Sequence, residues 1–515
     1  MSGAKSDLML HGGRIAGHRD ADSIAVGGGR IVACGRYAEL RPLVGPETHL
    51  IRLDGRTVTA GLIDSHLHFL EAASASAGVT VSRARDLAEL LFLLRQAAAR
   101  SAPGNWLKAF GCDEALLAEQ RGPTRQELDA TVPRNPLRLR HQTLHASWLN
   151  SRAIGLLGLE KADFTPPPGA RLVRDASHRL TGLVTGMEEW LTARLPPVTL
   201  ADLEARAKSY SRELAAAGVT SFTDATVRNG PRHVELFGQL VSWGAIAQHP
   251  AVMLGEDHLE SWDECRRIGR QSGVPVVAVK FRGRREPGDA EFNAKVERAI
   301  AAGAGCAFHA TEIEEVEAAL CALEWARDRL GRAAMANVAC RIEHGGVITP
   351  GQIGRIAALD AWVVTNPGFV FYRGEKYLGE PGLIPYTYRC RSLLRAGVRV
   401  AAGSDAPVTP ARPLTAIAAA MNRRDRRGHE LAPEERLDAA QAYGLFSTAG
   451  ARLMGRNAGA IAPGMEADLI VLPGNPLEMS GGELAEAAVE LTIIGGRVIY
   501  ERGRPASVTG IPETI

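Results

Sequence analysis

The sequence predicts an α/β protein whose main domain is a closed (β/α)8 barrel. Apolar, β-rich runs alternate with segments of helical periodicity through the middle of the 515-residue chain, which is typical of a parallel sheet with helical crossovers. Eight such runs favour a closed barrel. An open doubly wound sheet is the alternative, but the chain lacks the glycine-rich phosphate turn after its first strand. The expected strands span residues 57–63, 219–223, 249–254, 274–281, 305–309, 338–343, 361–365 and 398–403.

Both ends of the chain have a different pattern, in which short β-branched runs are broken by glycines such as Gly12-Gly13 and Gly495-Gly496. This pattern indicates hairpins. We expect residues 1–56 and 460–515 to form one composite β-sandwich, and residues 57–459 to form the barrel. Two unrelated terminal hairpins are the alternative.

One connection is much longer than an ordinary crossover. The first two expected strands are separated by residues 64–218, and rigid loop sequences such as Pro166-Pro167-Pro168-Gly169 lie between them. We therefore expect a large insertion after the first barrel strand, over about residues 75–200. An insertion at this position can wall a pocket and select substrates.

Composition excludes several classes of protein. The apolar content of 45% and the charged content of 23% are ordinary for a globular protein, and a net charge of +2 does not favour binding to nucleic acid or to a membrane surface. No apolar run approaches the ~20 residues that cross a bilayer. The seven cysteines are scattered without a Cys-x-x-Cys pair, which favours a reducing compartment. We expect a cytoplasmic protein.

Residues of the kinds that bind divalent metals stand at or just after the ends of five expected strands. Because the carboxyl ends of barrel strands meet at one face, these side chains are expected to converge there. Each alone has a plainer interpretation, as a core histidine, a paired lysine or a helix-capping aspartate; the joint pattern favours a metal centre. The six residues are His66, His68, Lys280, His309, His344 and Asp405.

Two of these positions carry further information. His66 and His68 are two apart in a strand, so both imidazoles point to the same side and can reach one metal ion. Lys280 ends an apolar strand, where an unpaired ammonium is costly. It either pairs with an acid or reacts with carbon dioxide to give a carbamate, an anionic ligand that can bridge two metal ions.

The order of these residues resembles the amidohydrolase superfamily in its binuclear form. Segments such as 111–114, 123–129, 145–150 and 461–469, together with Arg341-Ile342-Glu343-His344, resemble the branch that contains N-substituted formamide deformylases (amidohydrolase family 3-like). The chain departs from that branch after Lys280, where Phe281-Arg282-Gly283-Arg284-Arg285 replaces a common Asp-Gly pair.

The resemblance implies a TIM-like (β/α)8 barrel with a composite sandwich. It implies His66 and His68 on one divalent ion, His309 and His344 on the other, and carbamylated Lys280 as the bridge. Asp405 is then a ligand and a proton shuttle. Zinc is the expected metal, and a homodimer is consistent with the family.

The expected reaction is the hydrolysis of a non-peptide C–N bond in an N-substituted amide, a formamide or a cyclic amide. A metal-activated hydroxide attacks the carbonyl, Asp405 transfers the proton to the leaving nitrogen, and His145 of the insertion is a candidate oxyanion donor. The loop after the seventh strand supplies candidate substrate-binding residues, Asn366, Tyr372 and Arg373. For His145 a structural histidine is the alternative, and for Arg373 a surface arginine.

Two other functions stay open at this point. A mononuclear deaminase of a ring amidine uses the same barrel, although Lys280 argues against it. A metal-binding scaffold without turnover is the second alternative, and the complete set of ligands argues against that one. The expected partner is a small-molecule substrate.

Overall fold

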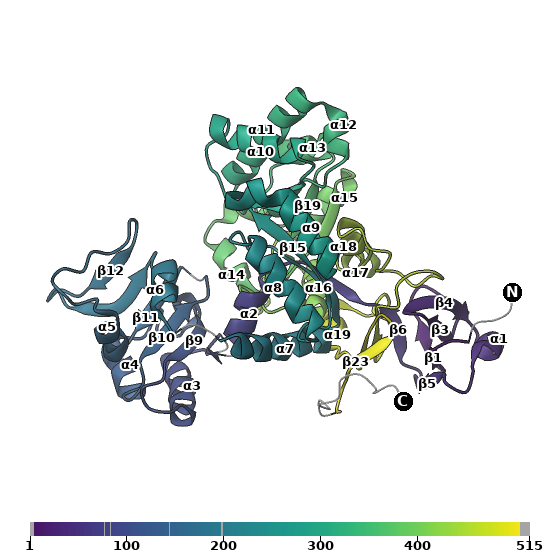
Figure 1. The fold of residues 1–515 in the computed structure, drawn as a ribbon, viewed down its shortest axis with the longest axis horizontal. Coiled ribbons are helices and arrows are strands. Elements are labelled where there is room, and N and C mark those ends of the chain that lie inside the picture. Colours follow the sequence, from purple (N-terminus) through teal and green to yellow (C-terminus); the bar gives the residue numbers. More distant parts are fainter. Residues whose placement is uncertain (1–4, 77, 83, 144, 197–198, 505–515) are drawn as a thin grey trace. The chain divides into compact units, whose positions relative to one another are not determined.

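The computed structural model describes residues 5–76, 78–82, 84–143, 145–196 and 199–504. The chain divides into two compact units, Met1–His68 with Ser211–Ile515 and the intervening Phe69–Tyr210 (Figure 1). The larger unit holds the barrel and the sheets built from the two ends of the chain.

The barrel sheet has eight parallel strands, which confirms the predicted fold class. Strands that are consecutive along the chain are also neighbours in this sheet, as expected for right-handed β/α units. Helices α8 to α11 and α13 surround the strands in Figure 1. The strands are β7 (Leu62–Leu67), β14 (Val219–Asp224), β15 (His249–Gly255), β16 (Val276–Phe281), β17 (Cys306–Ala310), β18 (Arg341–His344), β19 (Trp362–Thr365) and β20 (Arg399–Ala402). The helices of this unit are α8 (Pro231–Ser242), α9 (Trp262–Ser272), α10 (Ala290–Ala301), α11 (Ile313–Leu330), α12 (Arg332–Ala336), α13 (Pro350–Ala358), α14 (Gly368–Leu378), α15 (Cys390–Arg395), α16 (Pro413–Asn422), α17 (Ala439–Leu445), α18 (Thr448–Leu453) and α19 (Gly481–Glu486), with the short α1 (Tyr37–Leu40) near the N-terminus.

The first expected strand is two strands in the structure. β6 (Thr57–Ala60) pairs with β21 (Leu469–Leu472) in a terminal sheet, whereas the barrel strand β7 begins only at Leu62. Gly61 separates them, and a Cβ at Gly61 would lie 2.4 Å from Cγ2 of Thr220. The break therefore comes from a close approach of two strands that a continuous apolar run does not reveal.

The two ends of the chain share one core, as expected for a composite sandwich. A sheet ordered β4-β3-β1-β5 faces a sheet ordered β2-β6-β21-β22-β23, and side chains of both, such as Leu10 and Ile493, belong to one buried cluster. The end of the predicted range, residues 505–515, lies outside the described residues. The strands are β1 (Leu8–His11), β2 (Arg14–Ile15), β3 (Ser23–Gly27), β4 (Arg30–Gly35), β5 (His49–Arg52), β22 (Leu491–Ile494) and β23 (Arg497–Glu501).

The insertion follows β7 directly and has a hydrophobic core of its own. Its sheet is ordered β12-β13-β11-β10-β9-β8, and Leu90, Leu94, Leu128 and Leu139 are fully buried within the insertion. It is therefore a folded unit rather than a long loop. The strands are β8 (Val79–Thr80), β9 (Leu107–Cys112), β10 (Leu137–His141), β11 (Ala146–Leu149), β12 (Arg171–Arg174) and β13 (Leu180–Thr185), and the helices are α2 (Phe69–Ser76), α3 (Leu87–Arg100), α4 (Arg125–Thr131), α5 (Ser151–Leu157) and α6 (Glu188–Arg194), followed by α7 (Leu200–Ala216), which leads back to the barrel.

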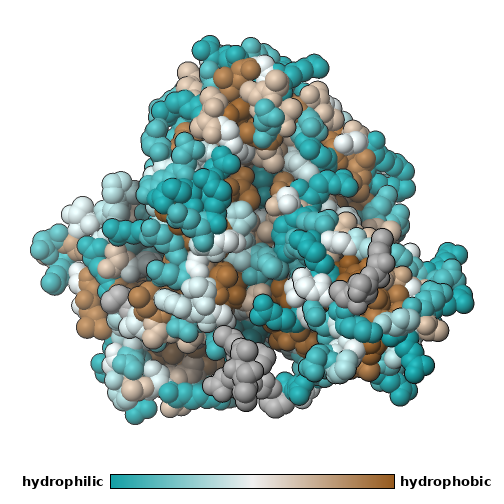
Figure 2. Space-filling view, turned by 45° about the vertical axis from the view of Figure 1, so that its right-hand side comes forward, coloured by the Kyte–Doolittle hydropathy of each residue, from teal (hydrophilic) through white to brown (hydrophobic). Residues whose placement is uncertain are grey.

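Hydrophobic residues are interspersed with hydrophilic ones on the face of the molecule seen in Figure 2. The exposed large apolar side chains are scattered over different elements, for example Phe92 on α3, Trp325 on α11 and Ile499 on β23. Within the described ranges, none of the helices combines the length and the apolar character that crossing a bilayer requires.

The barrel closes where the chain leaves its first and last strands. The amide of Asp405 donates to the carbonyl of His66 over 2.8 Å, and the amide of His68 donates to the carbonyl of Ala406 over 2.8 Å. Gly403 permits this approach, because a Cβ there would lie 2.5 Å from the backbone nitrogen of His66.

We predict that Gly403→Ala destabilises the fold by about 1–3 kcal/mol, because the added methyl group must push β20 away from β7. The matched control is Gly354→Ala on α13, where a Cβ would meet nothing within 4 Å. That change should be neutral, or stabilising by up to about 1 kcal/mol. Denaturant unfolding of both variants checks this, and equal midpoints would contradict the account of closure.

Candidate metal centre

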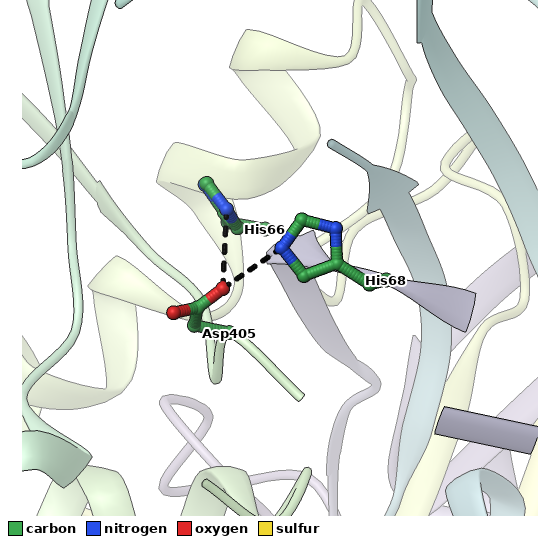
Figure 3. Close-up of side chains that lie close together, drawn as sticks. All are labelled: His66, His68 and Asp405. Atoms are coloured by element: carbon green, nitrogen blue, oxygen red, sulfur yellow. Dashed lines mark hydrogen bonds and ion pairs between the residues drawn. The ribbon is translucent and has the colours of Figure 1, made fainter. Parts of the chain in front are cut away.

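Three of the predicted ligands converge at the closure of the barrel (Figure 3). Nε2 of His68 lies 3.1 Å and Nε2 of His66 lies 3.4 Å from Oδ1 of Asp405. The ligand atoms of all three lie within 4.8 Å of one another. Asp405 follows β20 with a φ of +58°, and its amide is held by the carbonyl of His66. The backbone contact that closes the barrel thus also places the carboxylate.

The Nδ1 atoms of His66 and His68, which do not face Asp405, contact other side chains. Nδ1 of His66 contacts Oε2 of Glu343, and Nδ1 of His68 lies 3.0 Å from Oγ1 of Thr226. The carboxylate that accepts from Nδ1 of His66 favours the tautomer in which Nε2 keeps its lone pair and can bind a metal ion. Burial raises the pKa of the Asp405 carboxyl, but the neighbouring imidazoles outweigh burial and hold that pKa well below its usual range.

His309 and His344 form a second pair beside the first. Nε2 of His344 lies 3.0 Å from Nδ1 of His309, and the rings of His344 and His66 have centroids 4.7 Å apart. Burial lowers the pKa of both histidines. The charge of Lys280 is a further cause at His309, whose pKa falls to about 4. Both imidazoles are therefore neutral near pH 7, which is the form that binds metal.

Lys280 lies on β16 inside the barrel and is 3% exposed. Its Nζ has no hydrogen-bond partner among the described residues. Burial lowers the pKa of its amine to about 8, partly offset by the carboxylates of Glu343 and Asp405. Conversion to a carbamate would replace the buried amine with an anionic group that offers two oxygen donors to a metal ion. The predicted donors are nitrogen and oxygen atoms of the kind that a divalent cation such as zinc accepts, and three of them lie close enough together to hold one ion.

A buried ion pair between Arg341 and Glu343 lies beside the predicted ligands and was not expected from the sequence. Arg341 and Glu343 are two apart on β18, and both are almost completely buried. Nε of Arg341 donates to Oε1 of Glu343, and Nη2 donates to Oε2 over 3.0 Å and to the carbonyl of Ser65 over 2.7 Å. The alternation of β18 was the available signal, because it places both side chains on one face of the strand.

The three candidate substrate-binding residues follow β19, either before α14 or on it. Asn366 is fully buried. Its Oδ1 accepts from Nδ1 of His344 over 2.8 Å, and its Nδ2 donates to the carbonyl of Gly403 over 2.9 Å. One of these contacts orients the ring of His344, a predicted metal ligand, and contact of Asn366 with a substrate stays a prediction. Tyr372 and Arg373 are partly buried on α14, and their contact with a substrate stays a prediction.

His145 belongs to the insertion, where it is exposed on a bend before β11. Its role as an oxyanion donor also stays a prediction.

The departure from the related branch after Lys280 has a local explanation. Glu256 is buried at the end of β15 and accepts from Arg282 and Arg284, each over 3.1 Å. Between them lies Gly283, where a Cβ would lie 2.8 Å from Oε1 of Glu315 and 3.2 Å from Cδ2 of His309. The arginines of this loop thus neutralise a buried carboxylate, and the glycine leaves room for the Glu315 carboxylate and the His309 ring.

Comparison with known proteins agrees with this geometry. The sequence profile described as "Amidohydrolase family" matches residues 49–500. The chain belongs to the amidohydrolase family. An N-substituted formamide deformylase of Arthrobacter pascens is 29% identical to this amidohydrolase over 544 residues, which cover 96% of this chain and 98% of the relative.

Solved structures with the same fold include a metal-dependent hydrolase of Pyrococcus furiosus. It covers 92% of this chain and 100% of its own at 23% identity, with a TM-score of 0.70. An adenosine deaminase of Xanthomonas campestris, solved with bound zinc, covers 96% of this chain and 93% of its own at 15% identity, with a TM-score of 0.56. At such identities these likenesses show the fold. The family supports a hydrolase and implies a divalent metal ion.

We predict that the metal-free protein loses stability as the pH falls from about 6.5 to about 4. The folded state keeps His309 and His344 neutral, whereas the unfolded chain protonates them below the ordinary histidine pKa of 6.5. The unfolded state therefore binds more protons in this window. Thermal unfolding of chelator-treated protein across the window checks this. Replacing both histidines with glutamine should flatten the dependence, and an unchanged slope would refute the assignment.

Proposed function

We propose that this amidohydrolase hydrolyses a non-peptide C–N bond in a small molecule, namely an N-substituted amide, a formamide or a cyclic amide. The observation that carries the proposal is the convergence of His66, His68 and Asp405 beside His309, His344 and the unpaired amine of Lys280. The similarity to an N-substituted formamide deformylase, which covers nearly the whole of both chains, supports the choice of bond.

The ligands would divide between two divalent ions, for which zinc is the expected metal. His66 and His68 would hold one ion and His309 and His344 the other, with carbamylated Lys280 between them and Asp405 also a ligand. When bound, the ions supply a water-derived nucleophile at neutral pH and polarise the scissile carbonyl.

Asp405 is the residue we assign to proton transfer. Its carboxylate stays ionised near neutral pH, because the neighbouring imidazoles outweigh the effect of burial on its pKa. The hydrogen bond between its amide and the carbonyl of His66 fixes its position. A carboxylate held in this way accepts the proton that the attacking water loses and then donates it to the leaving nitrogen.

The remaining assignments concern the substrate. Arg373 could recognise a substrate carboxylate through its planar guanidinium, with Tyr372 beside it on α14. His145 is the candidate donor to the developing oxyanion. Asn366 stays a candidate substrate-binding residue, and it also contacts His344 and the carbonyl of Gly403. A cytoplasmic location and a homodimer remain predictions.

A mononuclear deaminase is the second candidate, since His66, His68 and Asp405 alone form a group that could hold one ion. A deaminase on the same fold has been solved with bound zinc. Lys280 argues for the first candidate, because a one-ion site leaves a buried amine without a hydrogen-bond partner.

The first test screens the zinc-loaded protein against amides, formamides, lactams, imides and carbamates. On the best substrate, Asp405→Asn should lower kcat by about 10²- to 10⁴-fold while most of the zinc is retained, because the amide cannot shuttle a proton. The control is Asp438→Asn at the N-terminus of α17, where asparagine caps equally well. Full turnover in Asp405→Asn would remove its assigned role.

Lys280→Ala should lose zinc and turnover together, because it removes the bridging ligand. Added acetate or propionate should restore part of both, since a small carboxylate can occupy the space of the missing carbamate. Lys295→Ala is the control, a lysine on α10 whose Nζ lies 3.5 Å from Oε2 of Glu256. If Lys280→Ala keeps its full zinc content and rate, the bridging assignment is wrong.

A further inference from the structure

A cavity lies on the outside of the barrel, beside the helix that precedes the last barrel strand. Its volume is about 410 Å³, within the range of small-molecule sites. Residues from the last turn of α15, which ends at Arg395, line one side of it. β20 begins at Arg399, after this turn, whereas the predicted metal ligand Asp405 follows the other end of β20. None of the predicted metal ligands lines the cavity, so it is distinct from the candidate metal centre.

Three arginines line this cavity, and a carboxylate of the described protein pairs with one of them. The arginines are Arg391, Arg395 and Arg436, and Asp438 is the acidic residue of the lining. Nη2 of Arg436 donates to Oε1 of Glu430 over 2.5 Å. In the part of the chain that the structure describes, neither Arg391 nor Arg395 forms an ion pair. Two guanidinium groups therefore lie at the cavity without an anion of their own.

A buried carboxylate fixes the two walls that carry these arginines. Glu435 is 2% exposed. Its Oε2 accepts from the amide of Ser392 over 2.8 Å, and its Oε1 accepts from Nε of Arg389 over 3.4 Å. These contacts join the start of α15 to the segment before α17. Nη1 of Arg391 also donates to the carbonyl of Glu434 over 3.3 Å. The cavity is therefore formed before any ligand arrives, as is usual for small-molecule sites.

We propose that this cavity binds the phosphate group of a small molecule through Arg391 and Arg395. A guanidinium group presents a planar set of N–H donors, which matches two oxygens of a phosphate. A phosphate dianion has enough oxygens and charge to pair with both arginines at once. The inference does not depend on the hydrolysis proposed above, because the cavity shares no residue with the metal centre.

The phosphate group belongs either to a free phosphate ion or to a phosphate ester, and the lining bears on this choice. Leu394 and Leu437 line the same cavity as the arginines. Leu437 is buried and Leu394 is partly buried, so both present apolar surface at a polar site. The organic part of an ester can cover this surface, whereas a free phosphate ion leaves it in contact with water.

The test titrates inorganic phosphate and phenyl phosphate into the protein by calorimetry at constant ionic strength, before and after treatment with a chelator. Phosphate held by a metal ion is lost on chelation, whereas phosphate in this cavity is retained. We expect one saturable site in the chelator-treated protein. Tighter binding of phenyl phosphate supports an ester as the ligand, and equal affinities support free phosphate. If neither compound binds saturably after chelation, the proposal is overturned.

Arg395→Gln is the most informative variant, because Arg395 is exposed and its replacement leaves the core intact. It should weaken phosphate binding by about 10- to 100-fold, as expected for the loss of hydrogen bonds to a charged group. Arg391→Gln should weaken binding to a similar extent. The matched control is Arg332→Gln, an exposed arginine at the start of α12, which should bind phosphate like the wild type. Equal affinities in Arg395→Gln and Arg332→Gln would overturn the proposal.

A change of opposite sign tests where the phosphate lies. Asp438→Asn removes the negative charge of the lining, and asparagine can still cap α17. Phosphate should therefore bind about 2- to 5-fold more tightly, the size of an interaction between exposed charges. Acetate, which carries one charge, should bind more weakly than phosphate. Weaker phosphate binding in Asp438→Asn, or acetate bound as tightly as phosphate, would contradict the assignment.

Discussion

The approach of β20 to β7 is the constraint on which the rest of the site depends. The hydrogen bond from the amide of Asp405 to the carbonyl of His66 closes the barrel, and Gly403 allows the backbones to meet. The same contact brings the carboxylate that follows the last barrel strand to two histidines at the end of the first one. Closure of the sheet and assembly of the predicted metal ligands are thus one structural event. The positive φ of Asp405 is tolerated because this contact fixes it.

Electrostatics inside the barrel explains why the site can hold cations. Charged and polar side chains from β7, β16 and β18 lie in a space with little solvent, where an unpaired charge is expensive. Arg341 and Glu343 neutralise each other. Asp405 lies beside the imidazoles of His66 and His68, and Nζ of Lys280 has no hydrogen-bond partner among the described residues. The family implies a divalent metal ion, and His66, His68 and Asp405 lie close enough together to hold one.

Much of this arrangement could be predicted from the sequence, because it follows from local pattern. The strand-end positions of His66, His309 and His344 follow from apolar runs of the right length, and the carboxyl ends of barrel strands meet on one face. The break at Gly61 could not be predicted, since it depends on Thr220, which is distant in the sequence. The alternation of β18 indicates that Arg341 and Glu343 share a face, but the contact of Glu343 with His66 could not be predicted, since β7 is distant in the sequence. The hydrogen bonds of Asn366 with His344 and with the carbonyl of Gly403 could not be predicted either, because a loop position does not reveal its partners.

The most direct test of the account is X-ray absorption at the zinc edge of the zinc-loaded protein. The account predicts two ions per chain, with nitrogen and oxygen neighbours at about 2.0–2.2 Å and a metal neighbour at about 3.5–4 Å. A single ion without a metal neighbour, or sulfur at about 2.3 Å, would contradict the central claim that these strand ends surround a pair of cations.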